Sequence, residues 1–136
     1  MKNLSITFFA IMALVFTACH ANAQQNKQMV ANNAAVIQVI QFHSAHRCVT
    51  CLKIENLTRS TLAASFRTVP FRLVNVDDKK NAKMAEQFQA SGTALFLYNP
   101  KSGKKKDLTD FAFMKASDEK KFTTELKKHI EDFIRS

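Results

Sequence analysis

Apolar and polar positions along the chain predict a mixture of strands and helices. Short apolar runs rich in β-branched and aromatic residues predict buried strands at 35–42 (AVIQVIQF), 71–76 (FRLVNV) and 93–98 (TALFLY). Between the first two runs, apolar residues recur near helical spacing from Cys48 to Phe66, in a stretch without Gly or Pro. The pattern therefore predicts a helix between two strands, which is typical of an α/β domain.

The second half of the chain predicts two more helices and a hairpin. Residues 77–89 (DDKKNAKMAEQFQ) carry acids in the first turn of a predicted helix, which ends at Ser91-Gly92. The turn residues NPKSGK then separate the third strand from 107–115 (DLTDFAFMK), whose alternation predicts the returning strand of a hairpin. In the last helix Ser117 is placed to cap the N-terminus. The apolar stripe of that helix comprises Phe122, Leu126, His129, Ile130 and Phe133.

The N-terminal segment MKNLSITFFAIMALVFTACHANAQQ predicts export. One Lys precedes an apolar stretch that ends near Ala18, and Ala21-Asn22-Ala23 supplies the small residues of a cleavage site. The stretch is shorter than the roughly 20 apolar residues of a membrane span, so we expect a signal peptide at 1–23 that is cleaved after Ala23. The alternative is a bacterial lipoprotein, because FTAC resembles a lipobox with the lipid on Cys19. Either route predicts a periplasmic or secreted protein.

Cleavage leaves a short leader and one domain. Residues 24–35 are polar without a clear period and predict a loose leader, whereas 36–136 are long enough for one domain with its own core. The chain is 46% hydrophobic and has a formal net charge of +9. Apart from KSGKKK its basic residues are scattered, so we expect a solvated basic surface and no nucleic-acid partner. This domain retains two cysteines, both in the stretch HSAHRCVTC, residues 43–51.

The CxxC spacing at the first turn of a helix favours thiol chemistry for a physical reason. Two cysteines three positions apart can bring their sulfurs within bonding distance, and the free N–H groups and positive dipole end favour a thiolate on Cys48. Arg47 adds a cation beside Cys48, and His46 adds to the effect when it is protonated or donates a hydrogen bond. We therefore expect Cys48 to be a nucleophile with a lowered pKa, and Cys51, one turn deeper, to be the resolving thiol.

Motif and element order together resemble the thioredoxin superfamily over about residues 36–135. The predicted order is β-α-β-α-β-β-α, with the CxxC after the first strand. RLVNVDD is similar to the family's second core strand and its acidic turn, and GTALFLYNPKSGK is similar to its third strand and hairpin. The resemblance implies a three-layer α/β/α fold with a central mixed sheet. It also implies a thiol–disulfide oxidoreductase that exchanges disulfides with protein thiols. We expect a monomer without a cofactor or metal, with a membrane redox partner as one route by which the cysteines are reset.

Three positions depart from the family pattern. Arg47 stands where an aromatic residue commonly precedes the first cysteine, and Phe42 stands where thioredoxin itself has a buried acid. The family's cis-proline, which faces the CxxC and helps to hold the substrate backbone, falls at Ala94. Because a cis bond before a non-proline residue costs about 2.5–4 kcal/mol, we expect the Thr93–Ala94 peptide bond to be trans. By this resemblance Thr93 and Ala94 are the substrate-binding positions.

Two other functions remain open for the same motif. His43, His46, Cys48 and Cys51 form a ligand set that suits copper(I) or zinc, and the residue that replaces the family's proline is too small to shield the cysteines from metals. The domain could instead be a redox-silent interaction module with a permanent disulfide. Such a small loop, however, stabilises a fold by only roughly 2 kcal/mol, so a bond placed for stability would link more distant segments.

Structural roles are also open for the neighbours of the cysteines. His43, directly after the first strand, suits a polar contact that supports the loop. Glu55 suits an ion pair with Arg59 at i+4 on the helix surface. His46 and Arg47 could be an exposed pair without a catalytic role.

Overall fold

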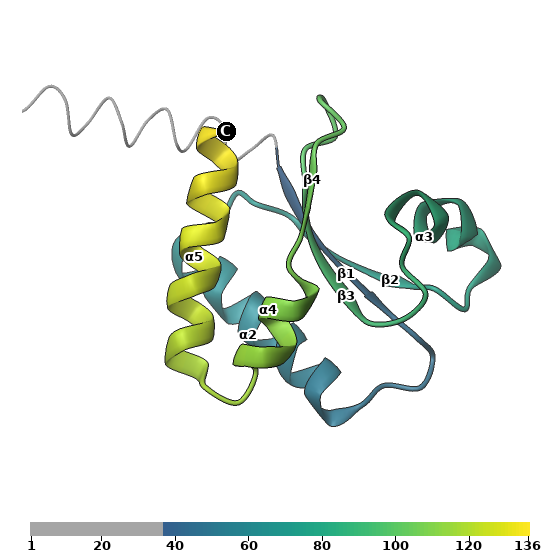
Figure 1. Cartoon of the computed structure of the whole chain (residues 1–136), viewed down its shortest axis with the longest axis horizontal. Coiled ribbons are helices and arrows are strands. Elements are labelled where there is room, and N and C mark those ends of the chain that lie inside the picture. Colours follow the sequence, from purple (N-terminus) through teal and green to yellow (C-terminus); the bar gives the residue numbers. More distant parts are fainter. Residues whose placement is uncertain (1–36) are drawn as a thin grey trace, which may run out of the picture.

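The computed structural model describes residues 37–136, so the predicted signal peptide and leader lie outside the described residues. The strands and α-helices of this part of the chain are labelled in Figure 1. Its strands are β1 (Gln38–His43), β2 (Phe71–Asn75), β3 (Ala94–Tyr98) and β4 (Lys105–Asp107). Its helices are α2 (Val49–Ser65), the short 3-10 helix η1 (Lys79–Asn81), α3 (Ala82–Phe88), α4 (Thr109–Lys115) and α5 (Glu119–Arg135).

The four strands form one mixed sheet in the order β2-β1-β3-β4. β1 pairs in parallel with β2 and antiparallel with β3, and β3 pairs antiparallel with β4. β1 is therefore an inner strand, and its almost continuous apolar sequence fits burial on both faces. In the register, Phe42 near the end of β1 lies opposite Val74 of β2 and Ala94 of β3. The first residue of β3 therefore lies beside the end of β1, next to the loop that leads from β1 into α2.

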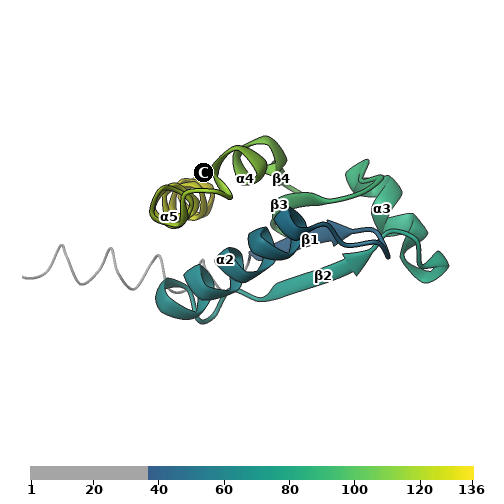
Figure 2. The same cartoon turned by 90° about the horizontal axis from the view of Figure 1, so that it is seen from below.

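Helices cover both faces of the sheet (Figures 1 and 2). Each face has its own core of buried side chains. α2, α4 and α5 pack on one face, where Leu97, Phe122, Leu126 and Ile130 are fully buried. α3 covers part of the other face and contributes Phe88 to a second core. The mixed sheet between helical layers is the α/β thioredoxin-like fold expected from the sequence.

The helix predicted from Cys48 to Phe66 is confirmed, with these two residues as the caps of α2. The predicted apolar stripe of the last helix is confirmed as well, except that His129 is only partly buried. Both helices use these apolar faces to cover the sheet, which is the main source of stability for an amphipathic helix. No helix within residues 37–136 is long and apolar enough to cross a membrane.

The returning strand predicted at 107–115 is wrong. β4 pairs antiparallel with β3 but ends at Asp107, and the chain continues as α4, so the observed order has one more α-helix than the predicted one. Asp107 Oδ1 accepts hydrogen bonds from the backbone N–H of Thr109, at 2.8 Å, and from its hydroxyl, which turns the chain out of the sheet. The segment is short enough to fit both strand alternation and the helical period. The apolar side chains that it buries at helical spacing are Leu108, Phe111 and Ala112.

Two helix termini also differ from the prediction. Asp118, not Ser117, caps α5, and its carboxylate accepts a hydrogen bond from the Lys121 N–H at 3.0 Å. A carboxylate at this position combines capping with a favourable interaction with the helix dipole. At the end of α3 the left-handed residue is Gln89, with φ 54°, so this helix ends before the predicted Ser91-Gly92.

Candidate functional site

Cys48 and Cys51 lie at the N-terminus of α2, and their sulfurs are joined in a disulfide with the Cα atoms 5.1 Å apart. Cys48 is the N-cap residue, with an extended backbone (φ −75°, ψ 157°). Its carbonyl accepts from the Leu52 N–H and its Sγ accepts from the Cys51 N–H, each at 3.1 Å. The Cys48 sulfur therefore stands where an N-cap side chain meets the unpaired N–H groups and the positive end of the helix dipole.

The two cysteines differ in their access to solvent. Cys48 is exposed, whereas Cys51 is only 5% exposed. Beside Cys48, Val49 is 84% exposed and Leu52 is 43% exposed. A thiolate arriving from solvent can therefore reach Cys48 next to apolar side chains, while the Cys51 sulfur is covered by the protein.

Arg47 extends along α2 to an ion pair instead of standing free beside Cys48. Its Nη2 lies 2.6 Å from Oε2 of Glu55, and Oε1 of the same carboxylate accepts from Arg59 Nε at 2.9 Å. The predicted pair of Glu55 with Arg59 is confirmed, whereas the pairing with Arg47 was not anticipated. Burial would raise the pKa of Glu55, but hydrogen bonds from Arg59 and Arg47, with their charges, outweigh it and lower that pKa. The ionised carboxylate partly neutralises Arg47.

The two histidines in the loop before the cysteines make different contacts. His43 Nδ1 lies 2.9 Å from the Ser44 carbonyl, which is the structural polar contact expected of it. His46 is exposed, and its carbonyl accepts from the Ser44 hydroxyl at 2.7 Å. Asp77, in the acidic turn after β2, accepts from the Ala45 N–H at 2.6 Å. Within residues 37–136 no group of three or more His, Cys, Asp or Glu side chains could hold a metal ion, so the suggested ligand set is not assembled.

Of the two positions expected to bind substrate, Thr93 is brought to the cysteines. Its hydroxyl donates a hydrogen bond to Cys51 Sγ at 3.2 Å. Ala94 begins β3 opposite Phe42, and its side chain packs against the core on the other face of the sheet. The peptide bond between Thr93 and Ala94 is trans, as expected, since residues 37–136 contain no cis bond.

Gln41 ties the first turn of α2 to the sheet by a hydrogen bond, and this contact was not predicted from the sequence. It is fully buried in β1, and its Nε2 donates to the Cys51 carbonyl at 3.0 Å. Phe42, the position of the family's buried acid, turns to the opposite face, where its ring centroid lies 5.3 Å from that of Phe88. A buried amide needs hydrogen-bond partners, so a Gln inside an apolar strand was the signal that could have identified this contact.

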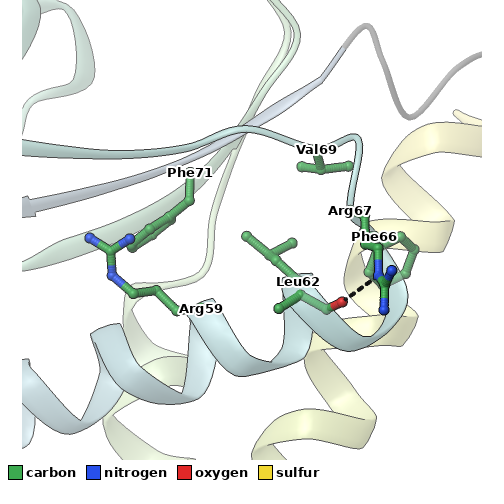
Figure 3. Close-up of a pocket in the computed structure, with 7 residues that line it drawn as sticks. Arg59, Leu62, Phe66, Arg67, Val69 and Phe71 are labelled. Carbon is green, nitrogen blue, oxygen red and sulfur yellow. Dashed lines mark hydrogen bonds between the residues drawn. The ribbon is translucent and has the colours of Figure 1, made fainter.

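A pocket of about 500 Å³ lies further along α2, near the end of the helix (Figure 3). The Arg59 guanidinium stacks over the Phe71 ring at 4.7 Å from the centroid, and Arg67 Nε donates to the Ala63 carbonyl at 3.1 Å. The apolar side chains below are already buried, so little apolar surface is left for a ligand. The cysteines are therefore the stronger candidate site. The pocket is lined by Arg59, Leu62, Ala63, Phe66, Arg67, Val69 and Phe71.

In comparisons with known proteins, no family model matches the sequence and no curated protein matches it either. The class of the protein therefore rests on its own fold and site. These are an α/β thioredoxin-like fold and a CxxC disulfide at the N-terminus of the helix that follows the first strand. This combination is compatible with a redox function.

Proposed function

We propose that this protein is an exported thiol–disulfide oxidoreductase that exchanges disulfides with protein thiols through Cys48 and Cys51. The observation that carries the proposal is a disulfide at a helix N-terminus between an exposed cysteine and a buried one. A disulfide that closes such a small loop stabilises a fold by only about 2 kcal/mol. The size of the loop supports exchange as its role, because a stabilising bond would join more distant segments.

Exchange proceeds through a mixed disulfide at Cys48. A substrate thiolate attacks Cys48 Sγ, the bond between Cys48 and Cys51 breaks, and its electron pair leaves on Cys51. A second thiolate of the substrate then attacks the substrate sulfur of the mixed disulfide and releases Cys48 as a thiolate. Two electrons pass from the substrate to the protein, and the substrate leaves with a new disulfide. The reverse sequence reduces a substrate disulfide.

Three groups stabilise the Cys48 thiolate in this proposal. The Cys51 N–H already donates to Cys48 Sγ, and this hydrogen bond strengthens when the sulfur is charged. Arg47 contributes a cation that Glu55 partly neutralises. His46, exposed in the same loop, contributes when it is protonated. A stabilised thiolate favours the reduced protein and makes the disulfide more oxidising.

The proposal includes the location and the partners. Residues 1–23 have the layout of a signal peptide, and disulfides persist in compartments outside the cytoplasm. We propose a monomer in the periplasm or outside the cell, with lipid attachment at Cys19 as the alternative. Its substrates are protein thiols or disulfides, and a membrane redox partner resets the cysteines. Val49 and Leu52 offer apolar contacts for the substrate segment beside its cysteine.

Oxidised protein mixed with a peptide that carries two thiols tests this function. We expect the Cys48–Cys51 disulfide to be lost as an equal amount of peptide disulfide forms, measured by mass spectrometry after acid quenching and alkylation. The equilibrium in glutathione buffers gives the reduction potential, which sets the direction of exchange. The variant with both cysteines changed to Ser is the control. Exchange no faster than that of oxidised glutathione would contradict the proposal.

A further inference from the structure

Cys51 is the sulfur that leaves when Cys48 is attacked, and it is buried. Burial disfavours a thiolate, because the low-dielectric surroundings replace water around the charge. The N–H of Cys51 donates to Cys48 Sγ, and its carbonyl accepts from Gln41. The main-chain N–H of Cys51 is thus already engaged, and the departing negative charge needs a donor from elsewhere.

Thr93 provides that donor. Its hydroxyl lies 3.2 Å from Cys51 Sγ and is the side chain that donates to this sulfur within residues 37–136. The sheet register explains the contact: Ala94 lies opposite Phe42, so the residue before β3 comes beside the first turn of α2. Gln41 ties that turn to β1 from below and keeps the sulfur within reach of the hydroxyl.

We propose that Thr93 is a catalytic residue of this site, which donates a hydrogen bond to Cys51 Sγ as that sulfur leaves as a thiolate. The inference rests on the function proposed above. A hydrogen bond to an anion is shorter and stronger than one to a neutral disulfide sulfur. The contact therefore stabilises the transition state more than the resting disulfide, which is the condition for faster exchange.

The step balances without a further reactant. Attack forms the bond between the substrate sulfur and Cys48, breaks the bond between Cys48 and Cys51, and leaves the electron pair on Cys51. Thr93 keeps its proton throughout and only donates the hydrogen bond. Of the two thiol protons of the substrate, one goes to solvent and one ends on Cys51, while Cys48 is released as a thiolate.

Variants at Thr93 test the hydroxyl separately from the shape of the side chain. Thr93→Val keeps the branched shape without the hydroxyl, Thr93→Ala is a second hydroxyl-free variant, and Thr93→Ser keeps the hydroxyl. Thr124→Val, at an exposed position of α5, is the matched control. The measurement is the rate constant for reduction of the Cys48–Cys51 disulfide by glutathione, recorded from pH 6 to 9 and expressed per glutathione thiolate.

We expect the rate constant to fall about tenfold in Thr93→Val and Thr93→Ala, as for the loss of one hydrogen bond to a charged group. Thr93→Ser should stay within about twofold of the parent, and Thr124→Val should match it. If Thr93→Val does not fold, as judged by circular dichroism, Thr93→Ala supplies the hydroxyl-free result. A Thr93→Ser rate constant close to that of the parent would assign the effect to the hydroxyl and not to the packing of the side chain.

Two results would overturn the proposal. Hydroxyl-free variants that react at the parent rate would show that the hydrogen bond does not act in the step. A Thr93→Ser variant as slow as Thr93→Val would assign the effect to packing. In both cases the parent still exchanges its disulfide, so the proposed function stands. A parent protein that does not exchange with thiols contradicts the function itself, which is a different outcome.

Discussion

Arg47, directly before the exposed Cys48, forms an ion pair with Glu55, which lies two turns further along α2. Arg47 Nη2 and Glu55 Oε2 are 2.6 Å apart. The cation that precedes Cys48 is therefore held by a carboxylate that also binds Arg59. Arg59 in turn stacks on Phe71 at the edge of the pocket in Figure 3. The electrostatic effect of Arg47 on Cys48 is thus set jointly with Glu55.

Replacing Glu55 with Gln should make Cys48 more reactive at low pH. The change removes a negative charge from the helix and leaves Arg47 without its neutralising partner, so we expect the alkylation profile of Cys48 to move to lower pH by a few tenths of a pH unit. Arg47→Ala should move the profile the opposite way and make the disulfide more reducing. Iodoacetamide rates from pH 4 to 8 at low ionic strength, in a Cys51→Ser background, measure the shift.

Glu86→Gln is the control for the loss of a carboxylate, because Glu86 is an exposed residue of α3. It should leave the alkylation profile of Cys48 unchanged. Overlaid profiles of Arg47→Ala and the parent would mean that Arg47 is only a surface residue. The helix terminus alone would then account for the reactivity of Cys48.

The two cysteines should differ in their capacity to trap substrates. We expect Cys51→Ser to accumulate mixed disulfides with a peptide disulfide through Cys48, because this residue is exposed. Cys48→Ser should trap few, because the Cys51 sulfur is buried. Non-reducing gels with mass spectrometry of the adducts give the measurement. Equal trapping by both variants would contradict these roles.

The fold should not require a metal ion. Hydrophobic cores on both faces of the sheet support the domain, and residues 37–136 contain no group of three metal-ligating side chains. Reduced protein should carry less than one equivalent of copper or zinc and should keep its Tm in chelator. One copper or zinc per chain that is lost in His46→Ala would instead favour metal binding as the function.

His129 should make stability depend on pH. Burial and then the charge of Lys106, whose Nζ lies 3.3 Å from Nδ1, lower the pKa of His129, against the opposing charges of Glu125 and Asp132. Below about pH 6.5 the unfolded chain therefore binds a proton at His129 more readily than the folded one. The stability that neutral His129 contributes is present above this pH and is lost as the pH falls toward the lower pKa of the folded state. The free energy of unfolding in urea should therefore decrease from pH 7.5 to 5.5.

His129→Gln should flatten this dependence, because the substituted side chain does not titrate. Thr124→Val, at an exposed position of the same helix, is the control. It should leave the difference between pH 7.5 and 5.5 close to that of the parent. A parent and a His129→Gln variant with the same pH dependence would remove His129 as its cause.

Periodicity predicted the elements that are long or strongly apolar. α2, the three apolar strands and α5 each present a face that the helical or strand spacing reveals without knowledge of the partner. The segment at 107–115 was misassigned because its apolar spacing fits both periods over so few residues. The segment forms a helix because Thr109 donates hydrogen bonds to Asp107 at its start and because Phe111 packs into the core at helical spacing.

The sequence by itself determined the α/β class, the position of the CxxC at a helix N-terminus and the asymmetry expected between the two cysteines, because these follow from spacing along one chain segment. Only the tertiary structure decided which side chains reach the buried sulfur and which one pairs with Arg47. Gln41 lies in β1 and Thr93 directly precedes the neighbouring strand β3, so the pairing of these strands brings both side chains to Cys51. Such contacts depend on sheet register and helix placement, which arise from packing of the whole core and leave no local pattern in the sequence.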